Sequence, residues 1–171
     1  MNTQAIKKSG NVRSWIASLA CGVVVCVFLA ACGGGIAGGK TSGGPHPDEA
    51  NIRTFLNSYF STWSARDLDA YGACFHPQAR ILLLESDGKV ISQGLTDFLH
   101  EQRMAHQLAK DKLEEKPLEM RIQGDMRAVQ AEVTWVLKKG DSEIRGTDFF
   151  TLKREGNGWK IVTLVFYGDP A

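Results

Sequence analysis

The chain has 171 residues with 20 Lys and Arg against 19 Asp and Glu, so its formal net charge is only +1. The basic residues are scattered rather than clustered, which argues against a nucleic-acid-binding surface. Three of them lie within the first 31 residues, so the rest of the chain has 17 basic against 19 acidic residues, a net charge near −2.

Residues 1–31 have the three-part order of a secretory signal peptide. Lys7, Lys8 and Arg13 form a basic start, residues 14–29 are an apolar run, and two small residues, 30–31, follow. The apolar run is too short to predict a membrane-spanning helix, which needs ~20 residues. We therefore expect residues 1–31 to be removed from the mature protein.

The end of this apolar run, Leu29-Ala30-Ala31-Cys32, resembles the lipobox of bacterial lipoproteins. The resemblance implies that Cys32 is lipidated, becomes the mature N-terminus and attaches the protein to a membrane of the periplasm or cell envelope. Because Gly33 is not the aspartate that resembles an inner-membrane retention signal, the outer membrane is the expected destination in a cell with two membranes. The alternative is an ordinary signal peptide followed by a chance cysteine.

Residues 32–47 are rich in glycine and predict a flexible tether, and residues 48–171 predict one folded domain of ordinary size. Two of the four cysteines lie in the signal peptide, and Cys32 is the candidate lipidation site. Only Cys74 remains in the domain, so no disulfide is expected there. We interpret Cys74 as a small buried hydrophobe; a catalytic thiol is the alternative.

Helices are predicted over Asp48–Ala65, over Leu68–Phe75 and from Asp97 to Glu115. The first has one apolar face at helical spacing. This face comprises Ile52, Phe55, Leu56, Tyr59, Phe60 and Trp63. Asp48 and Asp67 are candidate N-caps. The charged run at residues 110–116 predicts a solvated end of the third helix, stopped before Pro117.

Strands are predicted over residues 79–85 and 89–92, joined by an Asp87-Gly88 turn, and then over four longer segments. These are residues 118–123, 127–138, 142–154 and 159–167, separated by turns rich in glycine. The last segment is apolar on both faces, with Trp159, Ile161, Val165 and Tyr167 expected on one of them. A strand buried on both sides needs a second layer, so we expect a homodimer through the sheet face that the helices leave open.

Three stretches carry a resemblance to a known family: FLNSYF with Trp63, RDLDAY, and FHPQAR, supported by Gly94 and by GNGWKIV near the end. They resemble the nuclear transport factor 2-like superfamily, in particular its SnoaL-like and ketosteroid isomerase-like branch. The resemblance implies an α+β fold, with a curved antiparallel sheet packed against N-terminal helices into a cystatin-like cone around an apolar pocket. It is specific for fold and weak for function, because this fold hosts enzymes and binding proteins alike.

Such a pocket would hold a small apolar ligand. Its expected lining residues, for each of which simple core packing is the alternative, are Tyr59, Trp63, Phe75, Trp135, Phe150 and Tyr167.

Asp148 is the candidate catalytic residue because it is expected on an apolar strand face, where burial raises a carboxyl pKa toward the range of a general base. The isomerase-like relatives imply a partner for it that stabilises an oxyanion, and Tyr59 or Tyr71 is the candidate. The alternative is a structural ion pair between Asp148 and an arginine. The candidate arginines are Arg145, Arg127 and Arg80.

Three functions remain open. The absence of a clear acid–base pair favours a non-enzymatic, lipid-anchored module that binds a small molecule or mediates assembly. The second is an acid–base enzyme of isomerase, cyclase or dehydratase type that uses Asp148 and a tyrosine on a ketone-like substrate. The third is a structural envelope lipoprotein with a filled core. No metal or cofactor is expected, because no Cys–His cluster or phosphate-binding glycine loop is present.

Overall fold

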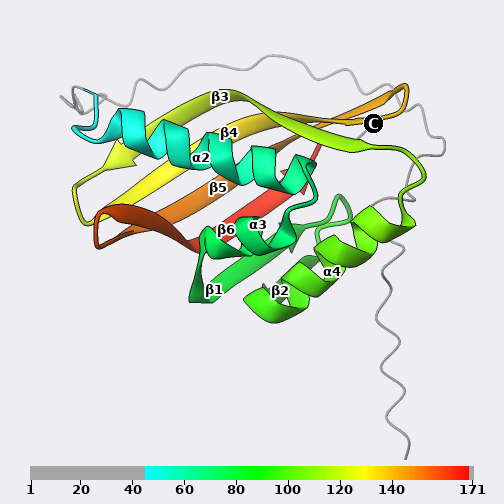
Figure 1. The fold of residues 1–171 in the computed structure, drawn as a ribbon, viewed down its shortest axis with the longest axis horizontal. Coiled ribbons are helices and arrows are strands. Elements are labelled where there is room, and N and C mark those ends of the chain that lie inside the picture. The colour runs from blue at the N-terminus through cyan, green and yellow to red at the C-terminus, as the bar shows by residue number, and fades with distance from the viewer. Residues whose placement is uncertain (1–44, 170–171) are drawn as a thin grey trace, which may run out of the picture.

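A computed structural model describes residues 45–169, which fold into one layer of helices on one curved sheet (Figure 1). The predicted signal peptide, Cys32 and most of the tether lie outside the described residues. The described helices are α2 (Glu49–Ser64), α3 (Leu68–Ala73) and α4 (Leu95–Leu108). The strands are β1 (Phe75–Leu84), β2 (Val90–Gly94), β3 (Leu113–Gly124), β4 (Ala128–Lys139), β5 (Ser142–Glu155) and β6 (Gly158–Gly168).

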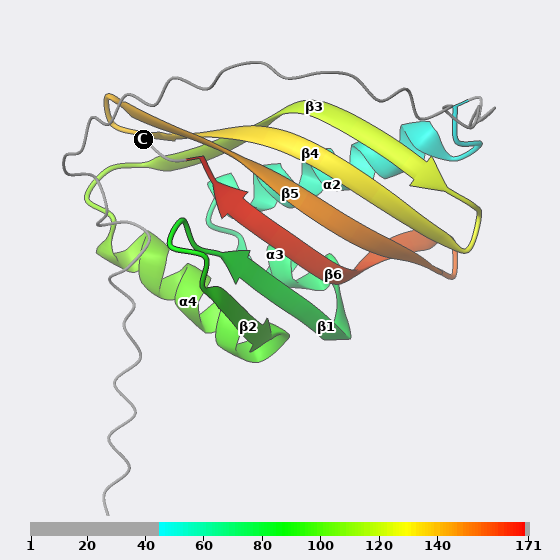
Figure 2. The same ribbon diagram turned by 180° about the vertical axis from the view of Figure 1, so that it is seen from behind.

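The six strands form one sheet in the order β2-β1-β6-β5-β4-β3. Neighbours are antiparallel except β1 and β6, which run parallel. Helix α2 lies along β3 and α4 lies beside β1 and β2, so the helices cover one face of the sheet (Figures 1 and 2). This confirms the predicted α+β class and the curved sheet packed against N-terminal helices.

Helix α2 follows its predicted apolar pattern, burying Ile52, Leu56, Tyr59, Phe60 and Trp63. Asp48 stands at its N-cap but makes no capping hydrogen bond. Its carboxylate instead accepts a hydrogen bond from Trp159 Nε1 at 2.8 Å and pairs with Arg154, which fixes the start of α2 to β5 and β6. Asp67 does cap α3, accepting from the Ala70 amide at 3.0 Å.

The third helix is shorter than predicted, since α4 ends at Leu108 and residues 113–115 belong to β3. Leu113 is 2 % exposed and pairs with Lys139 of β4, so burial of this one leucine outweighs the helix propensity of the charged run around it. Pro117 does not end a helix. It lies within β3 at a register shift, where the unpaired side of an edge strand tolerates a proline.

Strand β6 differs from its predicted pattern because a bulge falls between the pairs Leu152–Ile161 and Thr151–Thr163. The extra residue reverses the alternation, so Ile161 and Leu164 share the buried face while Val165 and Tyr167 point to the other one.

The outer face of the sheet has no helix over it in the described part of the chain (Figure 2). On this face Phe149 pairs with Val165, which pairs with Leu82, giving an apolar row across β5, β6 and β1. Phe149 is 39 % exposed, and its ring centroid lies 6.2 Å from that of Tyr167.

Candidate functional site

Asp148, in the middle of β5, is a buried acid whose hydrogen-bonding partner is an indole. It is 3 % exposed, and its Oδ1 accepts a hydrogen bond from Trp135 Nε1 at 2.6 Å. The alternative interpretation, an ion pair with Arg145, Arg127 or Arg80, is wrong, because no salt bridge within residues 45–169 involves Asp148. Arg145 precedes it by three residues on the same strand, so the pleat sends the two side chains to opposite faces.

Gly146 allows Trp135 to reach this acid. The two residues are directly paired across β4 and β5, and Asp148 lies two positions further along the strand. A Cβ atom at Gly146 would lie 2.2 Å from Cζ2 of Trp135 and 2.3 Å from the Tyr167 carbonyl oxygen. The indole of Trp135 therefore packs directly on the backbone of Gly146, and its N–H reaches the carboxylate of Asp148.

Glu115, near the start of β3, is a half-buried acid within electrostatic range of Asp148. The backbone of Glu115 is fixed by Ser64 at the end of α2, whose Oγ accepts from the Glu115 amide at 2.9 Å and donates to its carbonyl at 3.0 Å. Burial, and then the charge of Asp148, raise the pKa of Glu115 well above its ordinary value.

Burial also raises the pKa of Asp148 to about 7, against the opposing effect of the Trp135 hydrogen bond, which favours the ionised form. Two desolvated acids that affect each other titrate as a pair rather than independently. Burial therefore favours the protonated form of both carboxyl groups, and Asp148, with its pKa of about 7, is the one that can exchange a proton near neutral pH.

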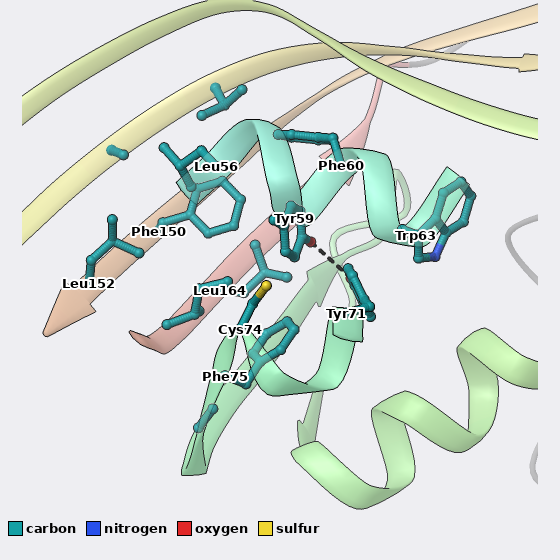
Figure 3. Packing of buried hydrophobic residues seen from close by; sticks show 14 of the residues in the cluster. Leu56, Tyr59, Phe60, Trp63, Tyr71, Cys74, Phe75, Phe150, Leu152 and Leu164 are labelled. Atoms are coloured by element: carbon teal, nitrogen blue, oxygen red, sulfur yellow. Dashed lines mark hydrogen bonds between the residues drawn. The ribbon is translucent and has the colours of Figure 1, made fainter. Parts of the chain in front are cut away.

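Two tyrosine hydroxyls lie in the same interior, with Tyr71 Oη donating to Tyr59 Oη at 2.9 Å (Figure 3). Both side chains are at most 3 % exposed, and burial raises the pKa of each well above its ordinary value. The charges of Asp148 and Glu115 raise both pKa values further, which places the tyrosines in the electrostatic range of the acids. The hydroxyls remain protonated at neutral pH and are available as hydrogen-bond donors.

The six predicted pocket residues do not line one cavity. Tyr59, Phe75 and Phe150 meet in the core, with the Tyr59 ring 5.9 Å and 5.2 Å from the other two rings (Figure 3). Trp135 is held by Asp148, and Trp63 lies away from both groups. Tyr167 points to the opposite side of the sheet, beside Phe149.

An open groove of about 720 Å³ lies instead between the end of α2 and the start of β3, and we call it the α2–β3 groove. Its lining residues are mostly polar: Asn57, Phe60, Ser61, Ser64, Ala65, Arg66, Lys112, Glu114, Glu115, Lys116 and Pro117. Glu115 belongs to this lining and also interacts electrostatically with the buried Asp148. It therefore connects a surface groove to Asp148.

His106 of α4 lies close to this end of α2. Its ring packs against Trp63 in a tilted arrangement with centroids 4.5 Å apart, while Trp63 Nε1 donates to Gln102 Oε1 at 2.9 Å. In the described part of the chain neither ring nitrogen of His106 makes a hydrogen bond of normal geometry, although the Trp63 backbone acts on the ring as a weak hydrogen-bonding partner. Burial, and then the charge of Arg66, lower the pKa of His106 and so favour the neutral imidazole, against the opposing effect of the Trp63 backbone.

Cys74 does not have the properties of a nucleophile. Burial raises the pKa of its thiol to about 11, so the reactive thiolate is absent at neutral pH. Within residues 45–169, no three His, Cys, Asp or Glu side chains are grouped in a way that could hold a metal ion.

Sequence reasoning identified Asp148 but missed Glu115, which it placed in a solvated helix end. A signal was present, because Pro117 disfavours a helical conformation at residue 116, and Leu113, Glu115 and Pro117 alternate as residues of one strand face do.

Similar solved structures define the class of fold. A cystatin-like protein of unknown function from Nostoc punctiforme is 12 % identical, with a TM-score of 0.61 over 72 % of this chain and 92 % of that one. The β subunit of benzoate 1,2-dioxygenase from Burkholderia mallei is 14 % identical, with a TM-score of 0.60 over 70 % and 89 %. A nuclear transport factor 2-like protein from Streptomyces avermitilis, described as a "putative dehydratase", is 10 % identical, with a TM-score of 0.60 over 75 % and 100 %.

The domain therefore has the nuclear transport factor 2-like, cystatin-like α+β fold, as its sequence predicted. Within that class, residues 47–167 match the family described as "putative lumazine-binding", and the chain belongs to this family. The curated proteins compared with the chain gave no match.

Proposed function

We propose that this domain binds a small molecule in the α2–β3 groove and that binding, rather than catalysis, is its main role. The observation that carries the proposal is the position of Glu115, a half-buried acid that lines a groove of about 720 Å³ and lies within electrostatic range of the buried Asp148. That volume lies within the range of ligand sites. Tyr59, Phe75 and Phe150 pack against one another in the core, whereas the groove is open to the surface and has room for a ligand.

The family description suggests a flat heterocycle such as lumazine as the kind of ligand. The edge of such a ring carries N–H donors beside C=O acceptors. A protonated carboxyl group offers the complementary pair, one O–H donor and one carbonyl acceptor. Burial raises the pKa of Glu115 and so favours its protonated form, which suits this edge.

The test is a titration of the protein with lumazine at pH 6.5, followed by the fluorescence of lumazine. Glu115→Gln keeps a donor and an acceptor and should bind within about threefold of the wild type, whereas Glu115→Leu should weaken binding at least tenfold, about 1.4 kcal/mol. Glu119→Gln is the matched control, since Glu119 lies on the same strand with its side chain 73 % exposed. Unchanged affinity of Glu115→Leu would show that the groove is not the site.

An acid–base enzyme acting on a ketone-like substrate is the second candidate. It is favoured by the raised pKa of Asp148 together with the protonated hydroxyls of Tyr59 and Tyr71. Deuterium exchange at the α-carbon of a cyclic ketone in D₂O, followed by NMR, tests it. Exchange that the wild type accelerates and Asp148→Asn does not would favour catalysis over binding alone.

The proposal also places the domain outside the cytoplasm as a lipoprotein held through Cys32, in the outer membrane where a cell has two membranes. The order of segments in residues 1–32 supports it. In residues 45–169, no helix has the length and apolar character needed to span a membrane.

A homodimer through the outer face of the sheet is part of the same proposal. The apolar row of Phe149, Val165 and Leu82 supports a second copy as the partner.

A further inference from the structure

Arg66 has a backbone conformation that ordinarily belongs to glycine. Its φ is +63°, and it follows Ala65, the C-cap of α2. The Arg66 amide donates to the Trp63 carbonyl and the Asp67 amide to the Thr62 carbonyl, both at 2.9 Å, so residue 66 closes the helix in the left-handed region. A side chain destabilises that conformation, and glycine is the usual residue there.

The Arg66 side chain gains no compensating partner from the protein. It is exposed and lines the α2–β3 groove, and no salt bridge or side-chain hydrogen bond in the described part of the chain involves it. The closure of the helix uses only backbone atoms of residue 66. The closure of the helix therefore explains the positive φ at this position, but it does not explain why the residue is an arginine.

The charges around the groove leave it positive. Three basic residues line it, against two acidic ones. Glu114 pairs with Lys116 at 3.2 Å, and Glu115 is held toward its neutral form by burial. The charges of Arg66 and Lys112 are therefore not balanced by the acidic residues of the lining, and they make the groove positive.

We propose that Arg66 binds an anionic group of the ligand, so that the α2–β3 groove accepts small molecules carrying a carboxylate or phosphate beside a neutral hydrogen-bonding edge. This inference rests on the groove's being the binding site. A guanidinium presents parallel N–H donors that match two oxygens of one anion, which a lysine ammonium cannot do. Glu115 and Arg66 then contact opposite ends of the same ligand, the protonated acid its neutral edge and the guanidinium its anion.

The experiment compares benzoate with benzamide, two probes of the same size that differ in charge, by NMR titration of the purified protein at pH 6.5. We expect benzoate to perturb the Arg66 Nε–H signal and to bind at least fivefold more tightly than benzamide. Arg66→Gln should abolish this preference, and Arg66→Lys should retain only part of it. Arg80→Gln is the control, because Arg80 is also exposed and lies on β1, separated from β3 by three strands.

Arg66→Gly separates the role in binding from a role in folding. Glycine relieves the left-handed strain, so the melting temperature should be unchanged or rise by up to about 4 °C while the preference for benzoate disappears. A melting temperature several degrees lower would show that Arg66 is structural and would overturn the proposal.

The outcomes separate this inference from the proposed function. If lumazine binds but benzoate shows no binding up to a concentration of about 20 mM, which corresponds to a binding free energy of about 2 kcal/mol, the role of Arg66 is overturned and the groove remains the site. Benzoate binding that depends on Arg66 without lumazine binding would support the anion site and reject the heterocycle. Benzoate binding that Arg66→Gln leaves unchanged would also overturn the inference.

Discussion

Replacing Asp148 with Asn should stabilise the protein at neutral pH and flatten the pH dependence of its stability. Asparagine has the same shape, and its Oδ1 can still accept the hydrogen bond from Trp135 Nε1. It carries no proton to lose, so it avoids the cost of a charge in the interior. The charge that raises the pKa of Glu115 also disappears.

The magnitude follows from the pKa of Asp148, which burial raises from 3.8 to about 7. Below pH 4 the carboxyl is protonated in both the folded and the unfolded states, and its stabilising contribution is fully present. Between pH 4 and 7 the unfolded chain loses the proton while the native state keeps it, so the free energy of unfolding falls as pH rises. Three pH units at 1.36 kcal/mol each give a loss of about 4 kcal/mol, complete above pH 7.

Urea unfolding followed by circular dichroism at pH 4.5, 5.5, 6.5 and 7.5 measures this slope. The wild type should lose several kcal/mol over the series, with a contribution from Glu115, and Asp148→Asn should lose much less. Asp141→Asn, in the exposed turn between β4 and β5, is the control and should follow the wild type. A wild-type stability that is flat or rises with pH, or an equal slope in Asp148→Asn, would refute the buried-acid argument.

Three further predictions concern other parts of the chain. Gly146→Ala should destabilise the protein by ~2 kcal/mol or more in urea unfolding, because its Cβ would meet Trp135, while Gly158→Ala, which meets nothing closer than 3.9 Å, should cost less than half as much. Light scattering at micromolar concentration should give a dimer that Phe149→Lys converts to a monomer; a monomeric wild type would contradict the proposed dimer. Cys32→Ser should release the protein from membrane fractions, and if it remains bound the lipoprotein proposal is wrong.

The fold was predictable because local signals and burial agree along most of the chain. The apolar face of α2 predicted both ends of this helix to within one residue, and Asp67 caps α3 as its position suggested. Two failures have a common cause. The start of β3 and the bulge in β6 are decided by which side chains fit the assembled core, and that information is absent from a local window of sequence.

The candidate site was predictable only in part. Asp148 was recognisable as an acid on an apolar face, but its partners come from other elements. Trp135 reaches it only because Gly146 leaves room, and Glu115 approaches only because residues 113–115 form a strand. Single-residue patterns suggest which side chains have unusual environments, whereas the tertiary fold determines which of them meet.

The features that cost stability are not scattered over this domain. Burying Asp148 costs about 4 kcal/mol at neutral pH, and the left-handed Arg66 costs ~1 kcal/mol. Ser64 fixes Glu115 beside the end of α2, and Arg66 and His106 interact electrostatically at that same end. Since a whole domain is stable by only about 5–15 kcal/mol, such costs concentrated in one place are typical of a binding site. We therefore expect Asp148→Asn and Arg66→Gly each to keep or increase stability while weakening binding in the α2–β3 groove, and a loss of stability without a change in binding would contradict this assignment.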